Sequence, residues 1–145
     1  MNTPLPYRVE EVAWADAADR LGAVRHEVFV VEQHVPEDLE WDDADAACRH
    51  VLALDGEGRA IGTGRLLPDG HIGRMAVLAG YRGRGVGRAI LDSLIAMAQA
   101  RGDAEVVLNA QTHAVGFYRR SGFEVTSSEF MDAGIPHLQM RRRLG

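Results

Sequence analysis

The sequence predicts an α/β domain of the α+β type, in which a single mixed, mostly antiparallel sheet is flanked by helices. Three observations support this prediction. Two long segments carry apolar residues at helical spacing, several short apolar runs are separated by turn signals, and a glycine-rich turn leads from one of these runs into the second helical segment. A chain of 145 residues suits one domain, spanning 1–145, around one hydrophobic core.

The first part of the chain predicts a strand, a helix and a loop. Residues 7–12 (YRVEEV) alternate in polarity, which is typical of a strand, and residues 14–33 carry apolar side chains on a helical period. Residues 34–47 contain a proline and six acidic residues and predict a loop. The apolar positions of the predicted helix are Ala17, Leu21, Val24, Val28 and Val31.

Three strands are expected next, at residues 49–55, 60–68 and 71–78. The turn signals GEG and PDG separate them, and such short connections favour an antiparallel meander. The glycine-rich stretch GYRGRGVGRAI (80–90) follows, and it leads into a helix that ends near residue 100, before RGD. The apolar stripe of this helix consists of Ala89, Ile90, Leu94, Met97 and Ala98.

The last part of the chain predicts a strand, a short helix and two closing strands. Residues 104–111 form the strand and residues 113–122 the helix, with Gly122 as the first residue past the helix end. Residues 123–131 and 135–144 are expected to be the closing strands. Strands therefore precede and follow each predicted helix, as in a mixed domain built around one sheet.

Composition excludes several functional classes. Hydrophobic residues make up 46% and charged residues 26% of the chain, as in soluble globular proteins, and no apolar run is long enough for a membrane span. The net charge is −5 and the arginines are scattered, which argues against nucleic-acid binding. The first residues lack a signal-peptide pattern and the single cysteine, Cys48, cannot form an internal disulfide, so we expect a cytoplasmic protein.

The glycine-rich stretch is the strongest functional signal. A Walker loop would need lysine and serine or threonine where Val86 and Gly87 stand, and a dinucleotide fingerprint would need glycine in place of Arg88. The pattern R-x-x-G-x-G remains, formed by Arg82, Gly85 and Gly87 between a strand and a helix. Backbone N–H groups at the helix N-terminus would bind a pyrophosphate, and the arginines would bind a further phosphate. The alternative is a glycine-rich turn whose arginines are only solvated.

Two segments resemble the GNAT superfamily of N-acetyltransferases. Residues 75–98 (MAVLAGYRGRGVGRAILDSLIAMA) resemble its acetyl-CoA-binding motif, and residues 106–125 (VVLNAQTHAVGFYRRSGFEV) resemble its following strand and helix, with the pattern F-Y-x-x-x-G-F. The segments VFVVEQHVP, IGRMAV and GIPH are similar to the bacterial ElaA/YjcF-like branch. The resemblance implies a GNAT-like acyl-CoA N-acyltransferase fold and acetyl-CoA or CoA as the cofactor.

The resemblance also implies how the cofactor is held. In this family the strand before the glycine turn is splayed from its neighbour, and its free backbone groups bind the pantetheine arm and the acetyl carbonyl. The turn would bind the pyrophosphate, and Asn109 would contact the cofactor from across the splay. The implied cofactor-binding residues are Met75, Ala76, Val77, Arg82, Gly83, Arg84, Gly85, Val86, Gly87, Arg88 and Asn109.

Tyr118 is the implied catalytic residue. It matches the family tyrosine that protonates the leaving thiolate of CoA in a direct transfer to an amine, and a phenol is a suitable proton donor for this step. The alternative is an aromatic side chain that only packs beside Phe117 and Phe123.

The general base departs from the family pattern. Many members carry a glutamate on the strand before the glycine turn, where this chain has Gly73 and Arg74. The remaining candidate bases are Glu32, His50, His71, His113 and His137. His50 and His137 are favoured because both lie on predicted strands that would border the cleft.

Further residues are candidates for contact with the acceptor substrate: Glu32, Gln33, His50, Arg65 and His137. Arg65 is either an anion contact in the cleft or a salt-bridge partner. The acids Glu37, Asp38, Glu40, Asp42, Asp43 and Asp45 form either a solvated loop or an acidic rim that attracts a cationic amine. No metal site is expected, and Cys48 is interpreted as structural.

The sequence thus predicts an acetyl-CoA-dependent N-acetyltransferase that transfers an acetyl group directly to a primary amine of a small molecule or peptide. No nucleic-acid or membrane partner is expected, and family likeness and base rate favour a homodimer. One alternative is a non-catalytic CoA-binding sensor or interaction domain on the same fold. Another is an acyltransferase that uses a longer acyl chain.

Overall fold

The computed structural model describes residues 7–40 and 43–145, with the side chains of residues 39 and 40 left out. Within these residues the strands form one sheet in the order β1-β2-β3-β4-β5-β8-β6, and β7 pairs with β8 beside this path. The strands are β1 (Tyr7–Val12), β2 (Arg49–Asp55), β3 (Ala60–Leu66), β4 (His71–Val77), β5 (Glu105–Gln111), β6 (Glu124–Val125), β7 (Phe130–Asp132) and β8 (Ile135–Arg143).

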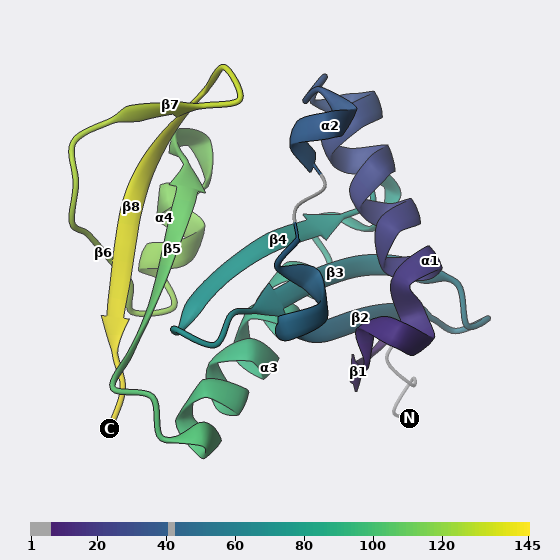
Figure 1. Cartoon of the computed structure of the whole chain (residues 1–145), viewed down its shortest axis with the longest axis horizontal. Coiled ribbons are helices and arrows are strands. Elements are labelled where there is room, and N and C mark those ends of the chain that lie inside the picture. Colours follow the sequence, from purple (N-terminus) through teal and green to yellow (C-terminus); the bar gives the residue numbers. More distant parts are fainter. Residues whose placement is uncertain (1–6, 41–42) are drawn as a thin grey trace.

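Helices cover both faces of this sheet (Figure 1). The helical elements are α1 (Trp14–Arg25), the π-helix η1 (His26–Glu32), α2 (Glu37–Glu40), α3 (Val86–Arg101) and α4 (Val115–Arg119), with 3-10 turns η2 (Asp45–Ala47), η3 (Ala79–Tyr81) and η4 (Thr112–Ala114). Alternation along β2 separates the two faces: Val51 and Ala53 share a core with α3, whereas Leu52 and Leu54 share one with α1. The expected mixed sheet flanked by helices is confirmed.

The predicted helix at 14–33 continues without a break but changes its winding. Beyond Arg25 the backbone follows a π-helix, and the Gln33 N–H donates to the carbonyl of Val28, five residues earlier. Each π turn takes more residues than an α turn, so the apolar stripe drifts off the buried face. Val31, the last apolar position of the predicted helix, is therefore 50% exposed.

The predicted meander is confirmed, and the sheet opens beyond it. β2 pairs antiparallel with β3 and β3 with β4. β4 and β5 are parallel but pair only at His71–Val107 and Ile72–Leu108, after which the two strands diverge (Figure 1). The β3–β4 register also shifts between Thr63 and Arg65. The diverging parts of β4 and β5 therefore leave backbone edges that face one another without pairing.

The C-terminal part differs from the prediction in one element. The strand expected at 123–131 is interrupted between β6 and β7, because Ser127 Oγ accepts the N–H of Gln139 in place of a backbone partner. The expected end of α4 is confirmed. Gly122 has φ 89°, its N–H donates to the Arg119 carbonyl, and the Phe123 N–H donates to the Tyr118 carbonyl, as in a Schellman motif.

Candidate active site

A cleft of about 990 Å³ lies where β4 and β5 diverge. It is lined by the diverging part of β4, by β5, and by residues of η1, α4 and β8. Of the predicted site residues, the cleft brings together Glu32, Gln33, Arg65, Met75, Ala76, Val77, Arg82, Gly87, Asn109, Tyr118 and His137, together with the candidate bases His71 and His113. Gly83, Arg84, Gly85, Val86 and Arg88 belong to the turn and the start of α3, beside this lining, and His50 lies outside it.

The glycine turn ends at the N-terminus of α3. Gly85 is the N-cap residue with φ 84°, a left-handed conformation that residues other than glycine rarely adopt. Its carbonyl accepts the N–H of Ala89, the first bond of the helix, so the N–H groups before Ala89 point out of the helix end. A Cβ on Gly85 would lie 3.3 Å from the hydroxyl of Tyr7, so the turn has little room for a side chain. These features fit a pyrophosphate group.

The arginines of the turn have different partners. Both Nη atoms of Arg82 donate to the carboxylate of Glu32 at 2.5 and 2.6 Å, and its Nε donates to the Val77 carbonyl. The hydrogen bonds between Arg82 and Glu32 lower the pKa of the Glu32 carboxyl and raise the pKa of the Arg82 guanidinium. Arg88 lies 3.5 Å from Asp92 one turn along α3. The guanidinium of Arg84 instead lies over the ring of Tyr81 in η3.

Glu32 and the next residue connect η1 to both walls of the cleft. Glu32 bonds Arg82, which follows β4. The side chain of Gln33 accepts a hydrogen bond from Nε2 of Gln111, at the end of β5, over 2.9 Å. The side-chain oxygen of Gln111 in turn lies 2.7 Å from Nε2 of His113. The end of η1 therefore spans the region where the two strands diverge.

Tyr118 lines the cleft from α4 with its ring fixed by aromatic neighbours. Phe117 and Phe123 contact it edge to face, with centroids 5.0 and 6.0 Å away. The hydroxyl donates a weak hydrogen bond to Sδ of Met75 on β4, at 3.9 Å. Enclosure by protein atoms raises the pKa of this hydroxyl to about 12, so it remains a proton donor at neutral pH.

The two favoured histidines occupy different environments. His137 lies on β8 with its ring stacked on Phe130, and its Nδ1 is 2.7 Å from the carbonyl of Ile135. A carbonyl only accepts, so Nδ1 carries the proton and the neutral ring has its lone pair on Nε2. His50 is 1% exposed, its Nε2 bonds the Asp45 carbonyl, and its ring packs on Trp14. Burial lowers the pKa of His50, which keeps that imidazole neutral.

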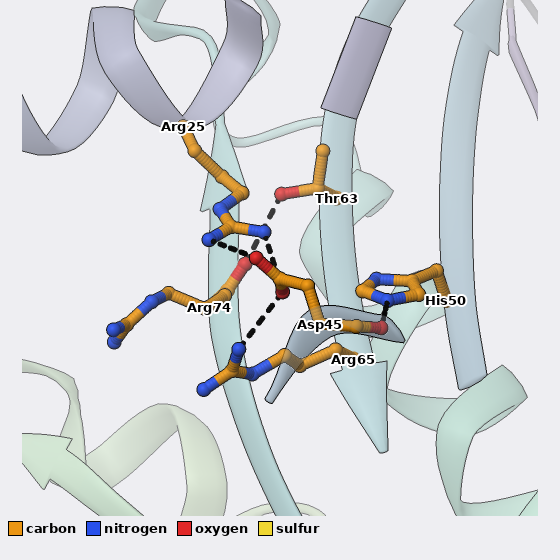
Figure 2. Close-up of polar contacts among 6 residues, drawn as sticks. All are labelled: Arg25, Asp45, His50, Thr63, Arg65 and Arg74. Carbon is orange, nitrogen blue, oxygen red and sulfur yellow. Dashed lines mark hydrogen bonds and ion pairs between the residues drawn. The ribbon is translucent and has the colours of Figure 1, made fainter. Parts of the chain in front are cut away.

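A buried ion-pair cluster adjoins the cleft through Arg65, which belongs to both. Figure 2 shows the carboxylate of Asp45 between the guanidinium groups of Arg25 and Arg65. Arg25 donates to both carboxylate oxygens at 2.9 and 3.1 Å, and Arg65 donates at 2.8 Å. Nearby, the hydroxyl of Thr63 donates to the carbonyl of Arg74, which has a positive φ of 51°. The cluster ties α1, η2 and β3 together.

This cluster answers two questions that the sequence left open. Arg65 is a salt-bridge partner of Asp45 and also lines the cleft, and its contact with an anion there stays a prediction. The expectation of a solvated acidic loop is wrong for Asp45, which is 3% exposed because two arginines neutralise it. Glu37, Asp38 and Asp43 are exposed, whereas Asp42 and the side chain of Glu40 lie outside the described residues.

Arg25 is the member of this cluster that sequence reasoning missed. It is 1% exposed, less than most apolar side chains of the molecule. Its position held a signal, because residue 25 falls on the apolar face of the helix, four residues after Leu21 and three before Val28. A charged residue on such a stripe indicates a buried partner, and Asp45 in the acidic segment is that partner.

Comparisons with known proteins agree with this geometry. Residues 8–144 match the family described as the acetyltransferase (GNAT) domain. The chain is 45% identical to the uncharacterized N-acetyltransferase YjcF of Bacillus subtilis over 123 residues, which covers 82% of this chain and 87% of that protein. No helix among the described residues is long and apolar enough to span a membrane.

Solved structures show the same fold. Escherichia coli ElaA superposes with a TM-score of 0.84 at 27% identity, covering 94% of this chain and 99% of ElaA. An acyl-CoA N-acyltransferase from Pseudomonas aeruginosa superposes with a TM-score of 0.83 at 31% identity, covering 94% of this chain and 99% of the other. The family match over almost the whole chain confirms the resemblance seen in the glycine-rich segment. The chain belongs to the GNAT family of acetyl-CoA-dependent N-acetyltransferases.

Proposed function

We propose that this protein transfers an acetyl group from acetyl-CoA directly to a primary amine of a small molecule or peptide. The observation that carries the proposal is the cleft between the diverging strands, where a proton donor on α4 and a basic nitrogen on β8 border the same space as unpaired backbone of β4. The activity would reside in one domain spanning 1–145. We further propose a cytoplasmic protein that acts as a homodimer and has no nucleic-acid or membrane partner.

The cofactor would lie along the open edge of β4. Backbone groups of Met75, Ala76 and Val77 would bind the pantetheine arm and the acetyl carbonyl, because β5 does not pair with them. The N–H groups at the start of α3 would bind the pyrophosphate, and Asn109 would contact the cofactor from β5. When bound, acetyl-CoA supplies the activated acetyl group as a thioester.

Two side chains would transfer protons during the reaction, His137 as the base and Tyr118 as the acid. Nε2 of His137 would take a proton from the acceptor ammonium, since Nδ1 already donates to Ile135 and fixes this tautomer. Oη of Tyr118 would donate a proton to the sulfur of the leaving CoA thiolate, because the raised pKa of the hydroxyl keeps it protonated beforehand. Glu32 and Gln33, at the cleft edge, would contact the acceptor together with Arg65.

Replacement of His137 tests its role as the base. We expect His137→Gln to lower kcat/KM at pH 7 by at least about tenfold, and to have a smaller effect at pH 9, where more of the acceptor amine is already neutral. The measurement is the pH profile of kcat/KM. His26→Gln, at the far end of η1, is the matched control. An unchanged profile in the His137 variant would exclude it as the base.

Replacement of Gly85 tests the pyrophosphate site. We expect Gly85→Asp to weaken CoA binding by at least about tenfold, because a carboxylate at the helix N-terminus repels the phosphates and its side chain occupies their space. Gly102→Asp is the control, since Gly102 lies at the other end of α3 and has a similar φ of 89° and open surroundings. Calorimetric titration of CoA measures both. Equal affinities in the two variants would contradict this assignment.

The activity itself is tested with acetyl-CoA and a panel of amines that includes amino sugars, polyamines and peptides, with release of free thiol as the readout. Turnover with at least one amine supports the proposal. Tight CoA binding without turnover on any amine would instead support a CoA-binding sensor domain, the second candidate. Parallel assays with longer acyl-CoA thioesters determine whether acetyl is the preferred group.

A further inference from the structure

The three arginines of the glycine turn differ in what they can still bind. Arg82 already gives both Nη atoms to Glu32, and Arg88 is paired with Asp92. The guanidinium of Arg84 instead lies over the ring of Tyr81, with 5.6 Å from Cζ to the ring centroid. A cation–π contact engages the flat face of the guanidinium and leaves the N–H donors at its edge available.

The ring beneath Arg84 is itself held in place. The hydroxyl of Tyr81 donates to Oδ2 of Asp55 at 2.9 Å. The other oxygen of this carboxylate accepts the backbone N–H groups of Glu57 and Arg59, both at 2.9 Å. The bond to Asp55 raises the pKa of the Tyr81 hydroxyl, which therefore remains a donor. Arg84 thus rests on a platform fixed by the β2–β3 turn, beside the N-terminus of α3.

We propose that Arg84 binds the 3′-phosphate of CoA and is the residue by which this protein distinguishes CoA from dephospho-CoA. The proposal rests on the proposed use of acetyl-CoA. CoA carries a phosphate monoester on its ribose in addition to the pyrophosphate, and such a group bears nearly two negative charges at neutral pH. A guanidinium binds it through two parallel N–H donors.

The neighbouring arginines are less suited to this role. A phosphate bound by Arg82 or Arg88 would lie next to the carboxylate that each of these arginines already contacts and would be repelled by it, whereas Arg84 keeps its aromatic contact while its edge donors bind. The platform also reduces the rotamer freedom that Arg84 loses on binding. Among the three arginines, Arg84 is therefore preorganised for a phosphate and loses the least free energy when it binds one.

The test compares two ligands that differ only in the 3′-phosphate. CoA and dephospho-CoA are titrated by calorimetry, at one fixed ionic strength, into the unmodified protein and the variants Arg84→Ala, Arg88→Ala and Arg20→Ala. The unmodified protein is expected to bind CoA about tenfold more tightly than dephospho-CoA. Arg84→Ala is expected to lose this preference while it keeps its affinity for dephospho-CoA. Arg88→Ala is expected to keep the preference, as is Arg20→Ala, which removes a remote exposed charge.

Each outcome has one meaning. Loss of the preference in Arg84→Ala alone supports the proposal. A preference that survives in Arg84→Ala, that disappears in Arg88→Ala instead, or that is absent from the unmodified protein overturns it while leaving the proposed use of CoA intact. Failure of the unmodified protein to bind either ligand overturns the proposed function as well.

Discussion

Tyr118→Phe is expected to lower kcat by about a hundredfold and to leave the affinity for CoA within about twofold. The variant keeps the ring, with its edge-to-face contacts to Phe117 and Phe123, and removes only the hydroxyl. The bond lost to Met75 is a weak contact with sulfur, so the free energy of unfolding should scarcely change. Steady-state rates with an acceptor amine, together with CoA titrations, provide the measurement.

The same variant separates the two interpretations of Tyr118. If the residue only packs, Phe replaces it without loss of rate, and an unchanged kcat would remove Tyr118 from the acid role. The pKa of about 12 also predicts how kcat depends on pH. Because a raised pKa keeps the proton bound until the pH approaches that value, ionisation of Tyr118 should not reduce kcat of the unmodified protein between pH 7 and pH 10.

Asp45→Ala is expected to lower the free energy of unfolding by about 3–5 kcal/mol, because it leaves the guanidinium groups of Arg25 and Arg65 buried without their shared carboxylate. Urea unfolding measures the loss. Asp43→Ala is a matched control, since it removes an exposed carboxylate two residues away and should change stability by no more than about 0.5 kcal/mol.

Loss of this cluster should also weaken binding of the acceptor in the cleft. Arg65 lines the cleft and donates to Asp45, so its position in the cleft wall depends on this bond. We expect the Asp45 variant, assayed where it remains folded, to show a raised KM for the acceptor. Equal stability of the Asp43 and Asp45 variants would show that the cluster contributes little to folding.

The sequence predicted most of the elements because their patterns are local. The meander followed from two short turns, and the position of α3 followed from Gly85 and the apolar stripe after it. The family was likewise recognisable from the short glycine-rich motif, and the family match over residues 8–144 confirms it. Local spacing and turn chemistry are sufficient for such features.

Features that depend on distant partners were not predictable in the same way. Nothing near Asp45 in the sequence indicates that Arg25, twenty residues earlier, neutralises it. The change of α1 into a π-helix was also missed, because α and π windings share the same apolar residues up to Val28. The tautomer of His137 depends on the backbone carbonyl of Ile135, and no side-chain pattern reports where a carbonyl points.

The π-helix has a consequence for insertions and deletions. A π turn can be regarded as one residue added to an α-helix, and removal of one residue within His26–Glu32 would restore regular winding. The turn would then be completed with one residue fewer, so the residues beyond the deletion would keep nearly the same direction about the helix axis. Glu32 and Gln33 would still face Arg82 and Gln111. A gap of one residue in this segment of an alignment is therefore compatible with an unchanged cleft.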